Sequence, residues 1–124
     1  MCGILGHLGQ SNLMKIIKNK PPRKFKLNKS IVLKDCGKIY LEPNEQVTFV
    51  TKKKKEYDVC KKNWVFYATP SINGRLQSFN FKTTLIKNII SKKIYLFLTE
   101  EGEEKKLYKY LMKENCKILK WLSK

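Results

Sequence analysis

Residues 94–122 read IYLFLTEEGEEKKLYKYLMKENCKILKWL and decide the fold, because their apolar period changes twice. In residues 94–99, Ile94, Leu96 and Leu98 occupy alternate positions, which predicts a strand. The next segment carries glutamates at its start and lysines further along, as the helix dipole favours. Its apolar side chains recur at helical spacing and predict a face that packs on a sheet: Leu107, Tyr108, Leu111 and Met112. Residues 116–122 then predict a final strand.

The preceding sequence has mainly β signals. Segments 31–33 and 38–41 predict a hairpin whose turn is Asp35, Cys36 and Gly37. Further strands are expected at 46–51, 56–59, 64–68 and 79–85, and the apolar run 64–68, which stops at Pro70, is expected to be buried on both faces. The expected fold is therefore α+β, with a mostly antiparallel β-sheet, a meander or partly closed barrel, and one C-terminal helix packed on it.

The first 22 residues differ from the rest. Leu13, Met14, Ile16 and Ile17 have the spacing of a short amphipathic helix, which the pair Pro21 and Pro22 would end. We therefore expect an N-terminal appendage at residues 1–22 and a single α+β domain at residues 23–124.

Length and composition limit the class of protein. The chain has 124 residues, of which 42% are hydrophobic, which suits one folded domain. No apolar run is long enough to cross a membrane and no signal peptide is recognisable, so a cytoplasmic location is expected. The widely spaced cysteines predict reduced thiols and no metal site, with Cys36 and Cys60 as small core residues. No cofactor is expected.

The formal net charge is +17, and 25 of the 27 basic residues are lysine. This excess has two interpretations: the codon bias of a bacterial genome poor in G and C, which gives a solvated surface, or a surface that binds a polyanion. Aromatic residues on the strands are expected in the core rather than as base-stacking platforms. The candidate polyanion contacts are Arg23, Lys24 and Lys26 in an extended arm, and Lys52, Lys53, Lys54 and Lys55 at a hairpin tip.

The segment WVFYATPSINGRL, residues 64–76, combines an apolar strand with a polar loop. Arg75 is one of only two arginines and could bind a carboxylate or phosphate through two hydrogen bonds. The candidate contact residues for a ligand or partner are Thr69, Ser71, Asn73 and Arg75. Asn73 and Gly74 suit positive φ in a tight turn. The alternative is a core strand followed by an ordinary turn whose arginine pairs with a surface acid.

This segment, the segment LKDCGKIYLEPNEQVTF at residues 33–49, the closing helix and Trp121 resemble short proteins of bacterial surface-polysaccharide gene clusters. The resemblance covers residues 24–124 and implies a cytoplasmic role near nucleotide-sugar or glycan assembly. It assigns no catalytic residue. The chain has Val65 after Trp64, where the resemblance leads us to expect glycine.

The start, Met1, Cys2, Gly3 and Ile4, resembles class II glutamine amidotransferases, in which methionine removal exposes a nucleophilic cysteine. The resemblance implies that Asn73 and Gly74 would stabilise the oxyanion. The Arg-Gly-Pro-Asp motif of that family is missing.

The sequence therefore favours a small cytoplasmic, non-catalytic accessory or binding protein, linked to surface-polysaccharide biosynthesis, with a protein or anionic small molecule as its partner. The alternative is a sequence-nonspecific RNA- or DNA-binding protein that uses its lysine-rich surface. The second alternative is a vestigial glutamine amidotransferase fragment.

Overall fold

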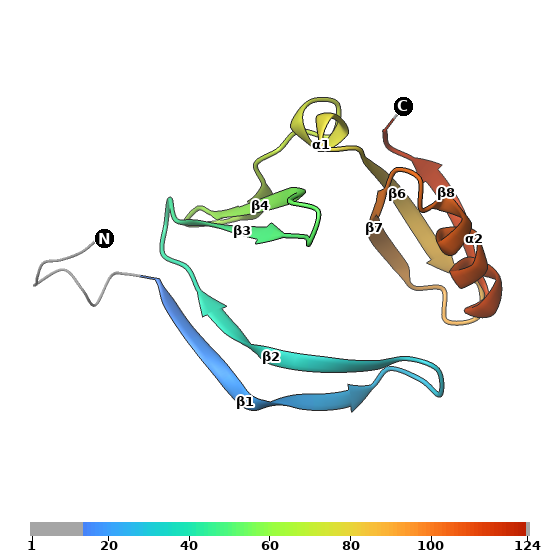
Figure 1. Ribbon diagram of the computed structural model, residues 1–124, viewed down its shortest axis with the longest axis horizontal. Helices are drawn as coiled ribbons and strands as arrows, with labels where there is room; N and C mark the ends of the chain where they lie inside the picture. Colours follow the sequence, from blue (N-terminus) through green and yellow to red (C-terminus); the bar gives the residue numbers. More distant parts are fainter. Residues whose placement is uncertain (1–13, 124) are drawn as a thin grey trace, which may run out of the picture. The chain divides into compact units, whose positions relative to one another are not determined.

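The computed structural model describes residues 14–123 and has an α+β fold built from open, mostly antiparallel sheets (Figure 1). The predicted class is confirmed, but within residues 14–123 the strands form open sheets rather than one closed barrel, and two helices are present instead of one. The elements are β1 (Lys15–Lys26), β2 (Val32–Tyr40), β3 (Gln46–Val50), β4 (Glu56–Lys61), β5 (Phe66–Ala68), α1 (Arg75–Ser78), β6 (Phe81–Asn88), β7 (Ile94–Glu100), α2 (Glu104–Lys113) and β8 (Cys116–Trp121).

The strands form three sheets, with strand orders β1-β2, β3-β4-β5 and β7-β6-β8. The chain divides into two compact units. The first comprises residues 1–47 and 59–67, and the second comprises residues 48–58 and 68–124.

In the first unit, β1 and β2 form a long antiparallel ribbon in which Ile16 faces Ile39 and Phe25 faces Leu33. The predicted short helix is wrong for residues 15–17, which lie in β1, and Leu13 lies outside the described residues. Cross-strand pairing with β2 decides the conformation here, since one short run of helical spacing gives little stability by itself. Strand β1 also runs through Pro21 and Pro22, where the register shifts between Lys18 and Arg23, the kind of irregular site at which a strand accepts proline.

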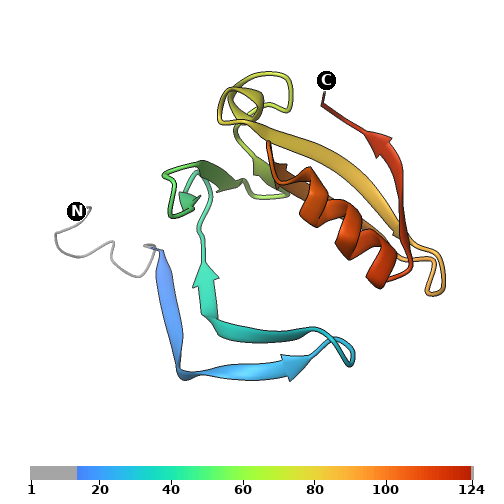
Figure 2. The same cartoon turned by 45° about the vertical axis from the view of Figure 1, so that its right-hand side comes forward.

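The predicted hairpin between segments 31–33 and 38–41 is also wrong, because Asp35, Cys36 and Gly37 lie inside the continuous strand β2. Gly37 has φ of +144° and lies so close to the backbone of Ile17 that a side chain would collide with it. The glycine therefore allows a close approach between the two strands rather than a chain reversal. Both strands of the ribbon are bent (Figure 2). Cys36 is exposed, whereas Cys60 is buried, so only Cys60 is the core residue expected.

The second unit has its core between α2 and the β7-β6-β8 sheet, along one face of which the helix lies (Figures 1 and 2). Ile86 of β6 is fully buried against Leu107 and Leu111 of the helix. An ion pair of 2.7 Å between Lys82 of β6 and Glu104 of α2 joins the same two elements. The predicted strand, helix and final strand of residues 94–122 are confirmed, since each has a strong local period. The predicted packed face of the helix is only half right, because Leu107 and Leu111 are buried whereas Tyr108 and Met112 are exposed.

Residues 64–68 depart from their predicted burial. Strand β5 covers only Phe66–Ala68, and both Trp64 and Phe66 are exposed. The expected positive φ is absent from Gly74, which has φ of −124° and immediately precedes α1. A continuous apolar run therefore does not guarantee burial, because burial depends on which element covers it.

Candidate functional site

The outer half of the β1–β2 ribbon has two chemically different faces. The register places Lys24 opposite Lys34 and Lys26 opposite Val32. Directly opposed residues of an antiparallel pair project to the same side of the sheet, and neighbours along a strand project to opposite sides. Lys24, Lys26 and Lys34 therefore share one face and are called the lysine face below. Arg23, Asp35, Phe25 and Leu33 share the other.

The charges on the other face are compensated. The Arg23 guanidinium donates a hydrogen bond of 2.8 Å to the Asp35 carboxylate and lies 5.1 Å from the centre of the Phe25 ring. The hydrogen bond from Arg23, followed by one from the Gly37 backbone N–H, holds the pKa of Asp35 below its ordinary value. Asp35 is the only acidic residue among residues 15–40, which contain nine basic residues. The single carboxylate of the ribbon thus neutralises Arg23 and leaves the lysine face unpaired.

All three side chains of the lysine face are exposed. No ion pair within residues 14–123 involves any of them. Like charges placed directly opposite on a sheet destabilise the pairing, so the Lys24–Lys34 pair gives no benefit to the ribbon itself. The arrangement presents three ammonium groups to solvent on one face of the ribbon, which suits a ligand with several negative charges.

The loop predicted as a contact surface is organised around a buried acid. Asp58 of β4 accepts a hydrogen bond from the guanidinium of Arg75, and its backbone carbonyl accepts one of 3.1 Å from Thr69 N–H. The Ser71 carbonyl accepts bonds from the N–H groups of Gly74 and Leu76, and Ser71 and Asn73 are exposed. Arg75 is therefore engaged with Asp58, which is buried rather than at the surface as the alternative interpretation expected.

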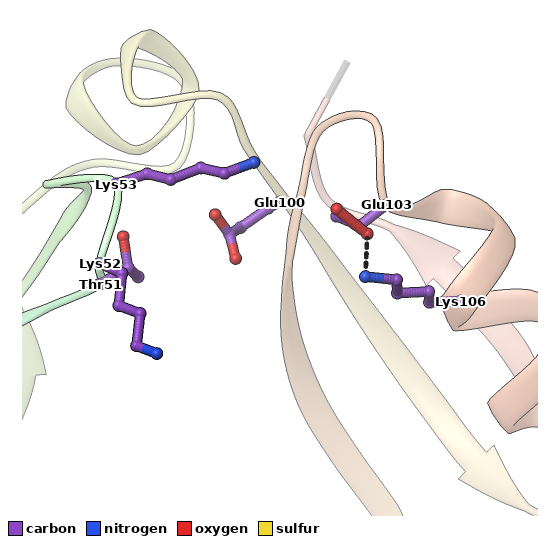
Figure 3. A pocket seen from close by; sticks show the side chains of 6 residues that line it. All are labelled: Thr51, Lys52, Lys53, Glu100, Glu103 and Lys106. Carbon is purple, nitrogen blue, oxygen red and sulfur yellow. Dashed lines mark ion pairs between the residues drawn. The ribbon is translucent and has the colours of Figure 1, made fainter.

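The predicted lysine hairpin tip is confirmed at residues 51–55, between β3 and β4, where Lys54 has positive φ. Lys52, Lys53 and Lys54 are exposed, whereas Lys55 forms an ion pair of 3.5 Å with Glu100. The tip and the start of α2 border an open depression of about 520 Å³ (Figure 3). The depression is lined by Thr51, Lys52, Lys53, Glu100, Glu103 and Lys106.

The depression has mixed charge. Glu103 and Lys106 form an ion pair of 2.9 Å, shown as a dashed line in Figure 3. The hydrogen bond from Lys106, and more weakly the charge of Lys53, hold the pKa of Glu103 below its ordinary value. Glu103 is therefore ionised at neutral pH and is poorly suited to act as a general acid. The lysines that line the depression are partly neutralised by its carboxylates, so the depression is a weaker anion site than the lysine face.

Sequence reasoning missed an aromatic pair at the turn between β4 and β5. Trp64 is 83% exposed and Phe66 is 64% exposed, although both were expected in the core. The ammonium group of Lys61 lies 5.2 Å from the centre of the Phe66 ring. The signal in the sequence is Asn63, a turn-forming residue directly before Trp64, which places the tryptophan in a turn instead of a strand.

No protein-family model, curated protein or solved structure matches this chain. Within residues 14–123 no group of three or more His, Cys, Asp or Glu side chains is arranged to hold a metal ion. The same residues contain no helix of the length and apolar character that crossing a bilayer requires. Cys2, the nucleophile implied by the amidotransferase resemblance, lies outside the described residues.

Proposed function

We propose that this protein is a non-catalytic binding protein and that it binds a polyanion through the lysine face of the β1–β2 ribbon. The observation that carries the proposal is the direct cross-strand opposition of Lys24 and Lys34, neither of which forms an ion pair with an acid within residues 14–123. Two lysines placed directly opposite each other destabilise the ribbon, so the pairing is not explained by the stability of the fold.

A polyanion gains affinity at such a surface by releasing its condensed counterions. The nearby acid cannot compete for the lysines, since Asp35 lies on the opposite face and is paired with Arg23. The preference for lysine over arginine favours recognition of charge over recognition of base edges, because lysine acts as a point charge. The proposed binding is therefore independent of sequence.

The loop with Thr69, Ser71, Asn73 and Arg75 is the alternative contact surface. We rank it second because its arginine is paired with Asp58 and none of its four candidate residues lines the depression of Figure 3. The predicted link to surface-polysaccharide assembly stays a prediction, and the identity of neighbouring genes tests it.

The proposal is tested by titrating the protein with inorganic polyphosphate over a series of salt concentrations. The triple variant Lys24→Gln, Lys26→Gln and Lys34→Gln is expected to bind roughly tenfold more weakly at low salt and to lose affinity less steeply as salt rises, because three phosphate contacts are removed.

The matched control is the triple variant Lys105→Gln, Lys109→Gln and Lys113→Gln, which makes the same change in net charge on the exposed side of α2. We expect this control to bind almost as tightly as the unmodified protein. Equal weakening in both triple variants would show that overall charge, and not the lysine face, attracts the ligand, and would refute the proposal.

A further inference from the structure

The turn that joins β4 and β5 contains a tryptophan, Trp64, that is not part of the core. Lys62 N–H donates a hydrogen bond of 2.8 Å to the Val65 carbonyl and closes the turn, so Asn63 and Trp64 form its tip. The Trp64 side chain is 83% exposed. A core position buries most of such a large ring, so the stability of the fold does not explain this residue.

A second ring lies two residues further along the chain. Phe66 is 64% exposed and begins β5. Phe66 and Tyr67 are consecutive in the strand and therefore project to opposite faces. The Lys61 ammonium lies 5.2 Å from the centre of the Phe66 ring, within the range of a cation–π interaction.

Two lysines accompany the rings. Lys61 donates a hydrogen bond to the Lys62 carbonyl, and the Lys62 ammonium donates one of 2.7 Å to the side-chain oxygen of Asn44. Both contacts engage neutral oxygens rather than carboxylates. No ion pair in the described part of the chain involves either lysine. The turn thus combines exposed flat rings with uncompensated cations.

We propose that this turn is a stacking site for unpaired bases of a single-stranded nucleic acid, with Trp64 and Phe66 as the rings and Lys61 and Lys62 beside the phosphates. This inference rests on the proposed polyanion binding and names the polyanion. Bases present flat π-faces that stack on aromatic side chains in a sequence-tolerant way, and in a duplex those faces are already covered by neighbouring base pairs. Polyphosphate has the charge but lacks the bases, so it distinguishes the two interactions.

The test measures the affinity of Trp64→Ala for oligothymidylate and for polyphosphate. We expect the affinity for oligothymidylate to fall between about fivefold and a hundredfold, in line with the loss of one stacked base. The affinity for polyphosphate is expected to stay the same. In a Trp121→Phe background, where Trp64 is the only tryptophan, oligothymidylate should quench the fluorescence and polyphosphate should not.

Two control variants complete the experiment. Trp64→Phe keeps a ring at the tip and should retain most of the affinity. Ile90→Ala removes a 74% exposed apolar side chain from the turn between β6 and β7 and should have no effect.

The outcomes separate this inference from the proposed function. If polyphosphate binds through the lysine face but Trp64→Ala leaves oligothymidylate affinity unchanged, the stacking site is refuted and the polyanion proposal stands. If the lysine-face variant binds polyphosphate normally while Trp64→Ala weakens oligothymidylate binding, the stacking site is supported and the lysine face is refuted. Equal weakening for both ligands in Trp64→Ala also refutes the stacking site, because polyphosphate has no base to stack.

Discussion

Asp58 is a buried carboxylate whose partners come from separate segments of the chain. A hydrogen bond from the Thr48 side chain, followed by that from Arg75, holds its pKa below the ordinary value of 3.8, although burial acts in the opposite direction. An ionised carboxylate without partners is costly in a buried site. These two partners therefore make the ionised form of Asp58 compatible with the fold.

We expect Arg75→Ala to lower the free energy of unfolding by about 1–3 kcal/mol at neutral pH, because it removes a charged hydrogen-bond partner from a buried acid. The Arg75 side chain is 42% exposed, so water replaces part of the lost interaction and places the effect toward the lower end. Urea unfolding measures this change.

The sign of the pH dependence follows from the lowered pKa. The stabilisation is fully present above the unfolded value near 3.8 and is lost as pH falls through the folded pKa. The difference in free energy of unfolding between Arg75→Ala and the unmodified protein should therefore become smaller at acid pH. A difference that stays constant down to acid pH would contradict a role through ionised Asp58.

At the scale of elements, the β1–β2 ribbon is a sheet of two strands in the part of the chain that the structure describes. A two-stranded ribbon is marginally stable in water, so its geometry is sensitive to single residues. Gly37 permits the close approach of β2 to Ile17 beside the register shift of β1. The bend, and with it the orientation of the lysine face, depends on this glycine.

Gly37→Ala is expected to destabilise the ribbon by about 1–3 kcal/mol, because the new methyl group meets the Ile17 backbone and the positive φ is unfavourable for alanine. Hydrogen exchange of the ribbon amides should become faster. Gly102→Ala is the matched control, since Gly102 also has positive φ but has open space where the methyl group would be placed. If the ribbon amides of Gly37→Ala exchanged hydrogen at the same rate as in the unmodified protein, the expected steric role of Gly37 would be contradicted.

At the scale of the whole molecule, the charge of +17 is not spread as an even coat. In the first unit it is concentrated on the ribbon, which has a single acid. In the second unit, several lysines pair with glutamates, as in the contacts of Lys55, Lys82 and Lys106. The two units carry similar net charges, and what distinguishes the ribbon is that Arg23 is the only basic residue among the described residues 15–40 that forms an ion pair.

The second unit depends on a small apolar core. Leu107→Ala should lower its free energy of unfolding by about 2–5 kcal/mol, because Leu107 is buried against Ile86 and its truncation leaves a cavity. Met112→Ala, on the same helix but 82% exposed, should change it by less than about 0.5 kcal/mol. The fluorescence of Trp121, which packs against this core, reports unfolding in urea. Similar losses in both variants would contradict the assigned orientation of α2.

Prediction from the sequence succeeded where one segment contains its own signal. The glutamates and apolar stripe of α2, the alternation in β7 and the lysine turn at residues 51–55 all define local structure without reference to distant residues. Prediction failed where one segment suits two conformations and a distant segment decides between them. Ile16 and Ile17 suit a helix or a strand, and only pairing with Ile39 and Lys38 decides between them.

The candidate sites also combine local and distant residues. The sequence indicates Lys24 and Lys26 of the lysine face, which are close together in the chain, but gives no signal for Lys34. Arg75 was selected for its rarity, and its partner Asp58 lies 17 residues away. Trp64 was assigned to the core because its apolar neighbours read as one buried strand.

The amino-acid sequence alone determined the α+β class, the order of the C-terminal strands and helix, and the large positive charge, because helical or alternating periods and charge totals are properties of consecutive residues. The tertiary structure decided that Lys24 lies opposite Lys34, that Arg75 is paired with a buried acid and that Trp64 is exposed. These three facts depend on strand register and on the packing of one element against another. Such contacts join residues that are far apart in the chain, so no pattern of consecutive residues predicts them.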